Sequence, residues 1–240
     1  MKEREGQALL SIIVPTYNEK KNLSELIRRI ERNLAGIPYE ILIVDDSSID
    51  GTADLARDLA GNSPIRLLQR GNKKGLASAI LDGMNQASGD TLCFMDADLS
   101  HPPEKLLEMF EAITENKADL VIGSRWARGS RLDEKWPVQR YLDSHMAGLL
   151  VRPLTSVKDS MSGFMMMKKS VVEGVLLKPI GYKIGLEILV KGKYSKAIEI
   201  PILFLDRSEG TSKMNLRVKV QFLIHIARLY GEQLFQGRHR

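Results

Sequence analysis

The fold is decided by the stretch Thr91-Leu92-Cys93-Phe94-Met95-Asp96-Ala97-Asp98, in which a short apolar run ends in two carboxylates. An apolar run of this length, bounded by turn residues, is typical of a buried strand. The chain turns directly afterwards, at Leu99-Ser100-His101-Pro102. We therefore expect a strand that ends at Met95 and presents both carboxylates on a non-helical tip.

Strand and helix patterns alternate on both sides of this stretch. The predicted strands are Leu10–Val14, Glu40–Val44, Ile65–Gln69, Thr91–Met95 and Asp119–Gly123. Helical patterns separate them at Asn22–Leu34, Ala53–Ala60, Lys74–Ala87 and after Pro103. Helices of this length connect parallel strands by right-handed crossovers. The sequence thus predicts an α/β fold with a mostly parallel sheet, whose ligands bind at the carboxyl ends of the strands.

The second half of the chain is less regular. Residues 125–136 are polar and basic, and they predict an active-site loop. Further patterns predict a helix at Tyr141–Leu154, a short strand at Phe164–Met167 and an edge strand at Ile198–Leu205 around Pro201. In Asn215–Phe235, the polar residues form one stripe of a mainly apolar helix: Arg217, Gln221, His225, Arg228 and Glu232.

The composition is that of one folded domain. The chain has 240 residues, 43% of them hydrophobic, and a net charge of +5. Its single cysteine, Cys93, excludes an intramolecular disulfide framework and a cysteine-based zinc site. Lys and Arg are dispersed, so no nucleic-acid partner is predicted. We find no apolar run near the roughly 20 residues of a membrane span and no signal-peptide core, so a cytoplasmic protein is expected.

Acidic residues follow two of the predicted strands. Asp96 and Asp98 can face one Mg²⁺ or Mn²⁺, which takes hard oxygen ligands and completes its shell with water and substrate phosphates. The pair can equally serve a turn or a helix N-cap. Asp45-Asp46 has the same two interpretations, as a helix cap or as an acceptor for a base or ribose. The segment Pro15–Glu19, which contains an aromatic and an acidic residue, follows the first strand. We expect it to lie beside both acidic pairs.

Basic residues at the other end of the chain predict phosphate binding. Arg125 follows the strand Asp119–Gly123, and Arg207 and Lys213 flank the segment Ser208–Ser212. A Gly/Ser-rich loop with such flanks can close over a diphosphate. The simpler interpretation of each is a solvated surface charge.

Together these motifs closely resemble inverting glycosyltransferases of family two, with the GT-A fold. The resemblance is carried by Ser11–Glu19, Ile43–Thr52, Met95–Pro102 and Gly123–Arg125. Within that family the chain is similar to the dolichyl-phosphate (polyprenyl-phosphate) mannosyltransferases, most clearly at Asp206–Lys213. The resemblance spans about residues 10 to 213. It implies a GT-A domain at 1–213 and a C-terminal amphipathic helix and tail at 214–240.

The resemblance implies inverting transfer of mannose from GDP-mannose to dolichyl or polyprenyl phosphate, dependent on Mg²⁺ or Mn²⁺. Asp96, Asp98 and Ser100 would hold the metal, and Arg125, Arg140 and Ser144 would contact the acceptor phosphate. Asp98, Arg125 and Arg140 would be catalytic. Apart from the resemblance, Glu187 is a candidate for contacts with sugar hydroxyls. Donor binding is implied for Pro15, Tyr17, Glu19, Val44, Asp46, Asp96, Ala97, Asp98, Arg125, Arg207 and Lys213.

Two departures from the family pattern bear on the substrates. Met165 stands where a basic residue is frequent, and Ala77 stands where a second glycine is common. A UDP-sugar donor or a non-catalytic scaffold subunit are therefore kept as alternatives.

The C-terminal helix has two interpretations. It can lie in a membrane interface, or it can pack on the sheet or a partner helix. The first interpretation, together with the lipid acceptor, predicts peripheral attachment to the cytoplasmic face of a membrane. A small membrane-anchoring protein is a possible partner in that attachment.

Overall fold

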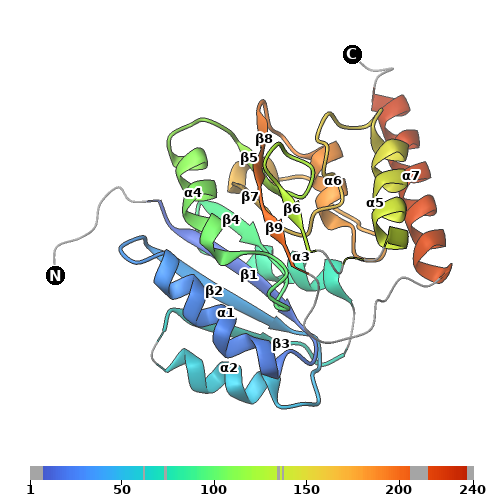
Figure 1. Ribbon diagram of the computed structural model, residues 1–240. Helices are drawn as coiled ribbons and strands as arrows, with labels where there is room; N and C mark the ends of the chain where they lie inside the picture. The colour runs from blue at the N-terminus through green and yellow to red at the C-terminus, as the bar shows by residue number, and fades with distance from the viewer. Residues whose placement is uncertain are drawn as a thin grey trace.

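In the computed structural model, the apolar runs of the sequence form one seven-stranded sheet (Figure 1). The structure describes residues 8–61, 63–72, 75–133, 136, 138–205 and 216–236, with only the backbone of 138–140, 216–219 and 234–236. The strand order is β3 (Ile65–Gln69), β2 (Tyr39–Asp45), β1 (Leu10–Thr16), β4 (Thr91–Phe94), β7 (Met165–Lys168), β5 (Leu120–Ser124) and β8 (Ala197–Pro201). The predicted α/β fold is confirmed. β7 is antiparallel to both neighbours, and β8 lies at an edge of the sheet, as its proline predicts.

Helices cover both faces of the sheet. On one face, α1 (Lys20–Asn33), α2 (Thr52–Ala60) and α4 (Leu106–Thr114) bury apolar side chains against Ile12 and Val14 of β1. On the other face, α3 (Leu76–Gln86) and α6 (Ile184–Lys191) pack against Ile13. Every residue of β1 is buried, which explains why the strand reads as a continuous apolar run.

The small residues of α3 let it approach the sheet closely. A Cβ atom at Gly83 would lie 2.5 Å from Cγ2 of Ile13 and 3.1 Å from Cγ2 of Val44. No side chain fits at that position without displacing the helix. This close packing sets the distance between α3 and the strand ends that carry the polar residues.

Two long helices stand side by side beyond the β5–β8 end of the sheet (Figure 1). α5 (Val138–Val151) and α7 (Leu216–Gln236) share a third apolar cluster with α6, which includes Val151, Leu186, Ile226 and Leu229. Nearby, β6 (Arg131–Leu132) pairs in parallel with β9 (Leu203–Phe204). Among the described helices, none has the length and apolar character needed to cross a bilayer.

In the described part of α7, the middle of the polar stripe, at His225 and Arg228, faces the protein. His225 is fully buried, whereas Val220, Leu223 and Ile224 are about half exposed. The helix thus buries His225 together with Ile226 and Leu229, whereas an amphipathic surface helix usually buries only its apolar residues. The cause is a buried carboxylate on α6, described below.

Candidate active site

The carboxyl ends of β1, β2, β4 and β5 open toward the same edge of the sheet. These strands all run in one direction, since β7 alone is reversed between β4 and β5. The topology therefore brings together the segments that follow them, which include Tyr17, Asp46, Asp96 and Arg125. This edge is the binding edge of an open α/β sheet.

Two buried carboxylates organise the ends of β1 and β2. Asp45 accepts hydrogen bonds from Thr16 Oγ1 and from the Ser48 amide, both at 3.0 Å. Asp46 forms an ion pair with Arg70, with 2.9 Å between Oδ1 and Nη1, and accepts a 2.8 Å hydrogen bond from the Gly75 amide. Both carboxylates thus link segments at the strand ends. The first amide of α2 is instead bound by Asp50, so the helix-cap interpretation of Asp45-Asp46 is wrong.

The other residues predicted to bind the nucleoside surround this pair. Tyr17 is half-buried after β1, and Glu19 precedes α1, where it accepts a 2.9 Å hydrogen bond from Asn22 Nδ2. Pro15 and Val44 are buried within their strands, and Val44 packs toward α3. Any ligand contact of Val44 would therefore involve its main chain.

The acidic tip consists of Asp96, Ala97 and Asp98, directly after β4. Ser100 holds one of its carboxylates, because its hydroxyl and amide donate hydrogen bonds of 2.6 and 3.1 Å to Asp98 Oδ1. Leu99 adopts φ 63°, a left-handed turn that brings Ser100 back onto Asp98. Asp98 is 5% exposed, whereas the Asp96 side chain is 25% exposed.

His101 supports the tip from beneath. Its Nδ1 accepts a 3.1 Å hydrogen bond from the Asp96 amide, and its ring stacks on Phe164 at 5.4 Å. Burial lowers the pKa of His101, despite the opposing carboxylates of Asp96 and Asp98. Through these two contacts His101 has a structural role, because it holds the turn that carries Asp96.

The donor set of the tip suits a hard cation that also binds substrate. Among the described residues, no three His, Cys, Asp or Glu side chains converge into a cage. Two carboxylates at a strand end nevertheless fit Mg²⁺ or Mn²⁺, because these ions keep waters and take other ligands from phosphates. Ser100 lies beside the pair, but its hydroxyl donates to Asp98.

Arg125 is held rigidly at the end of β5. Its Nε and Nη2 donate to the two oxygens of Asp159, at 2.8 and 2.7 Å, and its amide donates to Asp159 Oδ2 at 2.8 Å. The guanidinium carbon also lies 5.3 to 5.8 Å from the ring centres of Trp126, Trp136 and Phe204. A bidentate pair inside an aromatic enclosure fixes the direction of the cation.

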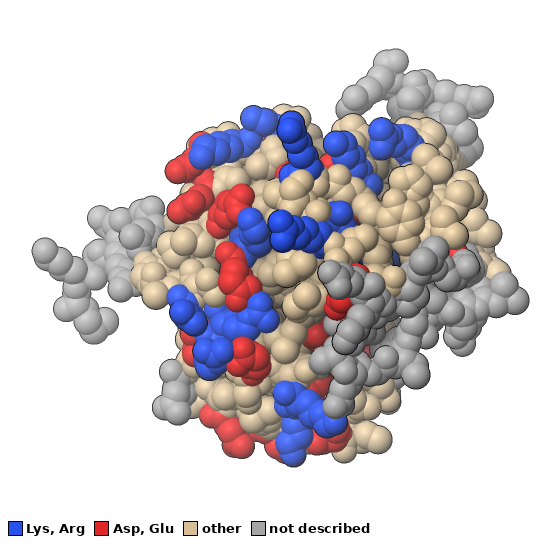
Figure 2. Space-filling view, in the orientation of Figure 1, with Lys and Arg blue, Asp and Glu red and all other residues tan. Residues whose placement is uncertain are grey.

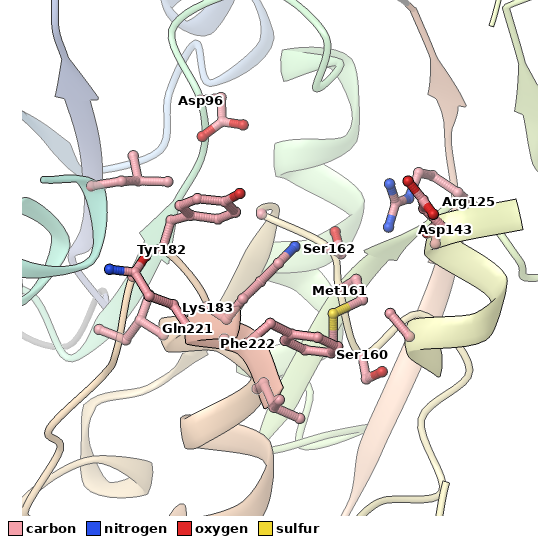
Figure 3. A pocket seen from close by; sticks show the side chains of 18 of the residues that line it. Asp96, Arg125, Asp143, Ser160, Met161, Ser162, Tyr182, Lys183, Gln221 and Phe222 are labelled. Atoms are coloured by element: carbon pink, nitrogen blue, oxygen red, sulfur yellow. The ribbon is translucent and has the colours of Figure 1, made fainter. Parts of the chain in front are cut away.

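A cavity of about 420 Å³ connects these polar groups to the two outer helices. Its polar part is lined by Asp96, Arg125 and Lys183, and Figure 3 shows Lys183 between Asp96 and Phe222. Its apolar part is lined by side chains of α5 and α7, namely Met146, Ala147, Leu150, Phe222 and Leu223. Met146, Leu150 and Leu223 are also exposed on the outside, so the cavity reaches the outer surface of α5 and α7. It suits a ligand with a charged head and an apolar chain.

Two hydroxyl groups in this cavity have no hydrogen-bond partner among the described residues. Ser144 Oγ, on α5, and Ser160 Oγ, next to Asp159, are both buried and unpaired. A buried polar group without a partner is costly and often marks a ligand site. Ser144 was predicted from the family resemblance, whereas Ser160 was not.

Besides Ser160, three site residues escaped the sequence analysis: Arg70, Asp159 and Lys183. Arg70 directly follows the strand Ile65–Gln69, and this position at a strand end is a signal that could have identified it. Asp159 and Lys183 lie in irregular segments and do not follow a strand, so they carry no such signal. Of the predicted residues, Arg207 and Lys213 lie outside the described part. Arg140 is in α5, one turn before Ser144, with only its backbone described.

Glu187 does not line the cavity, so the prediction that it contacts sugar hydroxyls is wrong. Its side chain is fully buried between α6 and α7, where Oε1 lies 2.7 Å from Lys191 Nζ and 3.1 Å from Arg228 Nη2. His225 Nε2 lies 3.5 Å from Oε2. Burial tends to raise the pKa of the Glu187 carboxyl, but His225, Lys191 and the Lys178 amide outweigh it and hold the pKa at about 2. This carboxylate turns the polar stripe of α7 inward.

We expect Glu187→Gln to lower the free energy of unfolding by about 3 kcal/mol, because it removes the charge of a fully buried carboxylate that pairs with Lys191 and Arg228. The pKa of Glu187 is about 2 in the folded state, below its ordinary value of 4.5. Its contribution is therefore complete above pH 4.5 and is lost as the pH falls toward 2. Urea unfolding at pH 7 and pH 3 measures both effects. An equal loss of stability in the variant at the two pH values would contradict the assignment.

Comparison with protein families finds a match to Glycosyl transferase family 2 over residues 11–176. The dolichol-phosphate mannosyltransferase of Pyrococcus furiosus is 46% identical over 92% of this chain, which spans 63% of that protein's length. The dolichol-phosphate mannosyltransferase of Saccharomyces cerevisiae is 37% identical over 92% of this chain and 86% of its own length.

Solved structures show the same fold at low sequence identity. Mycobacterium tuberculosis glucosyl-3-phosphoglycerate synthase, in complex with Mn²⁺, UDP and glucosyl-3-phosphoglycerate, has a TM-score of 0.66 at 18% identity, over 93% of this chain and 79% of that one. The mannosyltransferase PcManGT of Pyrobaculum calidifontis, in complex with GDP-Man and Mn²⁺, has a TM-score of 0.63 at 17% identity, over 96% and 65%.

Proposed function

Because this chain belongs to glycosyl transferase family 2 and is a glycosyltransferase, we propose that it transfers mannose from GDP-mannose to dolichyl or another polyprenyl phosphate. The observation that carries the proposal is the cavity, which joins Asp96 and Arg125 to an apolar opening between α5 and α7. A sugar or protein acceptor has no long apolar chain that would occupy this opening. A phosphate on a long apolar chain would fill both parts.

The residues fit a reaction that needs no general base. A phosphate acceptor is already anionic at neutral pH, so the main barrier is the approach of two anions. Arg125 is fixed so that it can direct an acceptor phosphate toward the anomeric carbon, with attack on the face opposite the leaving diphosphate and inversion there. Ser144 would donate its unpaired hydroxyl to the same phosphate, and Arg140 would join from one turn earlier on α5.

The acidic tip would serve the donor. Asp96 and Asp98 would hold Mg²⁺ or Mn²⁺, with Ser100 fixing Asp98 or joining the metal shell. The ion would neutralise the diphosphate as it leaves. Two solved structures of the same fold are complexes with Mn²⁺, which supports a divalent ion here. Asp46, Tyr17 and the other predicted donor residues would hold the nucleoside along the ends of β1 and β2, with Arg207 and Lys213 on the phosphates.

Donor identity is tested by calorimetry with GDP and with UDP, each with and without Mn²⁺ or Mg²⁺. We expect metal-dependent binding that favours GDP. Preference for UDP would agree with the proposed site but would indicate that the donor is a UDP-sugar. Binding of neither nucleotide would support a non-catalytic scaffold.

We further propose that the outer surface of α5 and α7 attaches the protein to a membrane as a peripheral protein, on the cytoplasmic side. The members of this α5–α7 apolar face are all 41 to 58% exposed: Tyr141, Leu142, Met146, Leu149, Leu150, Val220, Leu223 and Ile224. In Figure 2, charged side chains are interspersed over the centre and left, while the described atoms at the right-hand edge, where α5 and α7 lie, are mostly tan. Contiguous exposed apolar residues of this kind indicate an interaction surface.

Liposome flotation tests this attachment. Wild-type protein is expected to float with liposomes, and Leu223→Glu with Ile224→Glu is expected to leave most of it in solution, because two charges must leave water. Leu176→Glu is the matched control, since Leu176 is 68% exposed outside this face. If the double variant floats like wild type, the face does not contact the membrane. If wild-type protein floats only with a small membrane protein added, that protein is the anchor.

A further inference from the structure

Lys183 projects into the cavity from the residue just before α6. In Figure 3 the ammonium group of Lys183 lies in the middle of the cavity. Asp96 and Arg125 lie farther away around it, and Gln221 and Phe222 of α7 line the cavity near the stem of the lysine. It therefore stands where the polar part of the cavity meets the apolar part. A lipid phosphate that enters between α5 and α7 would bring its charged head to this boundary.

The charge of Lys183 is not balanced in the way that the charge of Arg125 is. Arg125 is matched by Asp159 in a bidentate pair. In the described part of the chain Lys183 makes no ion pair, and its ring contact is with Tyr182, at 5.5 Å from Nζ to the ring centre. Burial, and then the positive charge of Arg125, lowers the pKa of Lys183 to about 8. An ammonium group in this setting is stabilised by an anion that arrives with a ligand.

Neighbouring groups in the cavity are donors that an anion would satisfy. The hydroxyls of Ser144 and Ser160 are unpaired, and Ser160 is only 2% exposed. They come from α5 and from the segment before β7, whereas Lys183 directly precedes α6. Donors from three separate elements thus line one cavity, which is the arrangement that holds a tetrahedral oxyanion.

We propose that Lys183 binds the phosphate of the lipid acceptor, on the side of the cavity opposite Arg125. This inference rests on the proposed function and adds a contact that orients the acceptor. The donor diphosphate is assigned to the acidic tip, so Lys183 should govern the affinity for the acceptor and not the affinity for the nucleotide.

The test compares wild type, Lys183→Met and Lys183→Arg in two assays. In the first, calorimetry measures binding of decyl phosphate and of uncharged decanol without any donor. We expect Lys183→Met to weaken decyl phosphate about 30-fold, the loss typical of one charge-assisted contact, with decanol unchanged and Lys183→Arg retaining most of the affinity. In the second, mannosyl transfer should show a raised KM for polyprenyl phosphate, while the Kd for GDP stays constant.

The controls separate this inference from the proposed function. Lys178→Met, at an exposed lysine before α6, should match wild type, and thermal unfolding shows whether each variant is folded. Equal binding of decyl phosphate by wild type and Lys183→Met overturns the proposal, as does a weakened Kd for GDP. If the enzyme fails to use GDP-mannose but still binds decyl phosphate through Lys183, the proposed substrate is wrong and the phosphate contact stands.

Discussion

Asp98→Asn is expected to lower kcat for mannosyl transfer by about 10³-fold, since it removes charge from the group that would hold the ion on the leaving diphosphate. The substitution keeps the size of the side chain, so the turn at Leu99 and Ser100 should persist. The loss should be accompanied by a loss of the metal-dependent gain in GDP affinity. Steady-state kinetics and calorimetry, with and without Mn²⁺, measure the two effects.

The matched control is Asp54→Asn, an exposed carboxylate of α2 whose side chain is 79% exposed. It should leave activity and metal dependence unchanged. Full activity of Asp98→Asn, or an unaltered response of GDP binding to Mn²⁺, would show that the acidic tip does not hold the metal.

Arg125→Met is expected to lower kcat by about 10²- to 10³-fold, because in the proposed reaction the guanidinium would direct the acceptor phosphate. Arg125→Lys should recover little of this loss, because a lysine cannot form the bidentate pair with Asp159. Asp159→Asn should give a smaller loss, since Arg125 stays in place but is held less firmly. Kinetics with saturating acceptor measure each effect.

A loss of folding would imitate these results, because Arg125→Met leaves the buried Asp159 carboxylate without its paired guanidinium. The double variant Arg125→Met with Asp159→Leu removes the whole pair. It should regain stability in urea unfolding but not activity. If the double variant were as active as wild type, Arg125 would have a structural role only.

The sheet could be predicted from the sequence because its strands are buried on both faces. β1, β2 and β4 carry uninterrupted apolar runs, and each ends in turn residues that are easy to recognise. The direction of β7 could not be predicted, because an isolated apolar run such as Met165–Lys168 can pair with its neighbours in either the parallel or the antiparallel direction. Its direction is set by the long segment that precedes it.

The site was predictable where its residues are close in sequence to a strand end. Asp96, Asp98 and Arg125 met that condition. Asp159 lies 34 residues from its partner Arg125, and Lys183 owes its place to the packing of α6, so neither has a local signal. The orientation of α7 was missed for a related reason. Its polar stripe matches a carboxylate on another helix, Glu187, which the helical pattern alone cannot reveal.

The central claim is most directly tested by transfer of labelled mannose from GDP-mannose to dolichyl phosphate, with the product extracted into organic solvent and its anomeric configuration determined. We predict a metal-dependent lipid product with inverted configuration, absent in Asp98→Asn and absent when dolichol replaces dolichyl phosphate. Label that stays in the aqueous phase with wild-type enzyme, Mn²⁺ and dolichyl phosphate all present would contradict the proposed function.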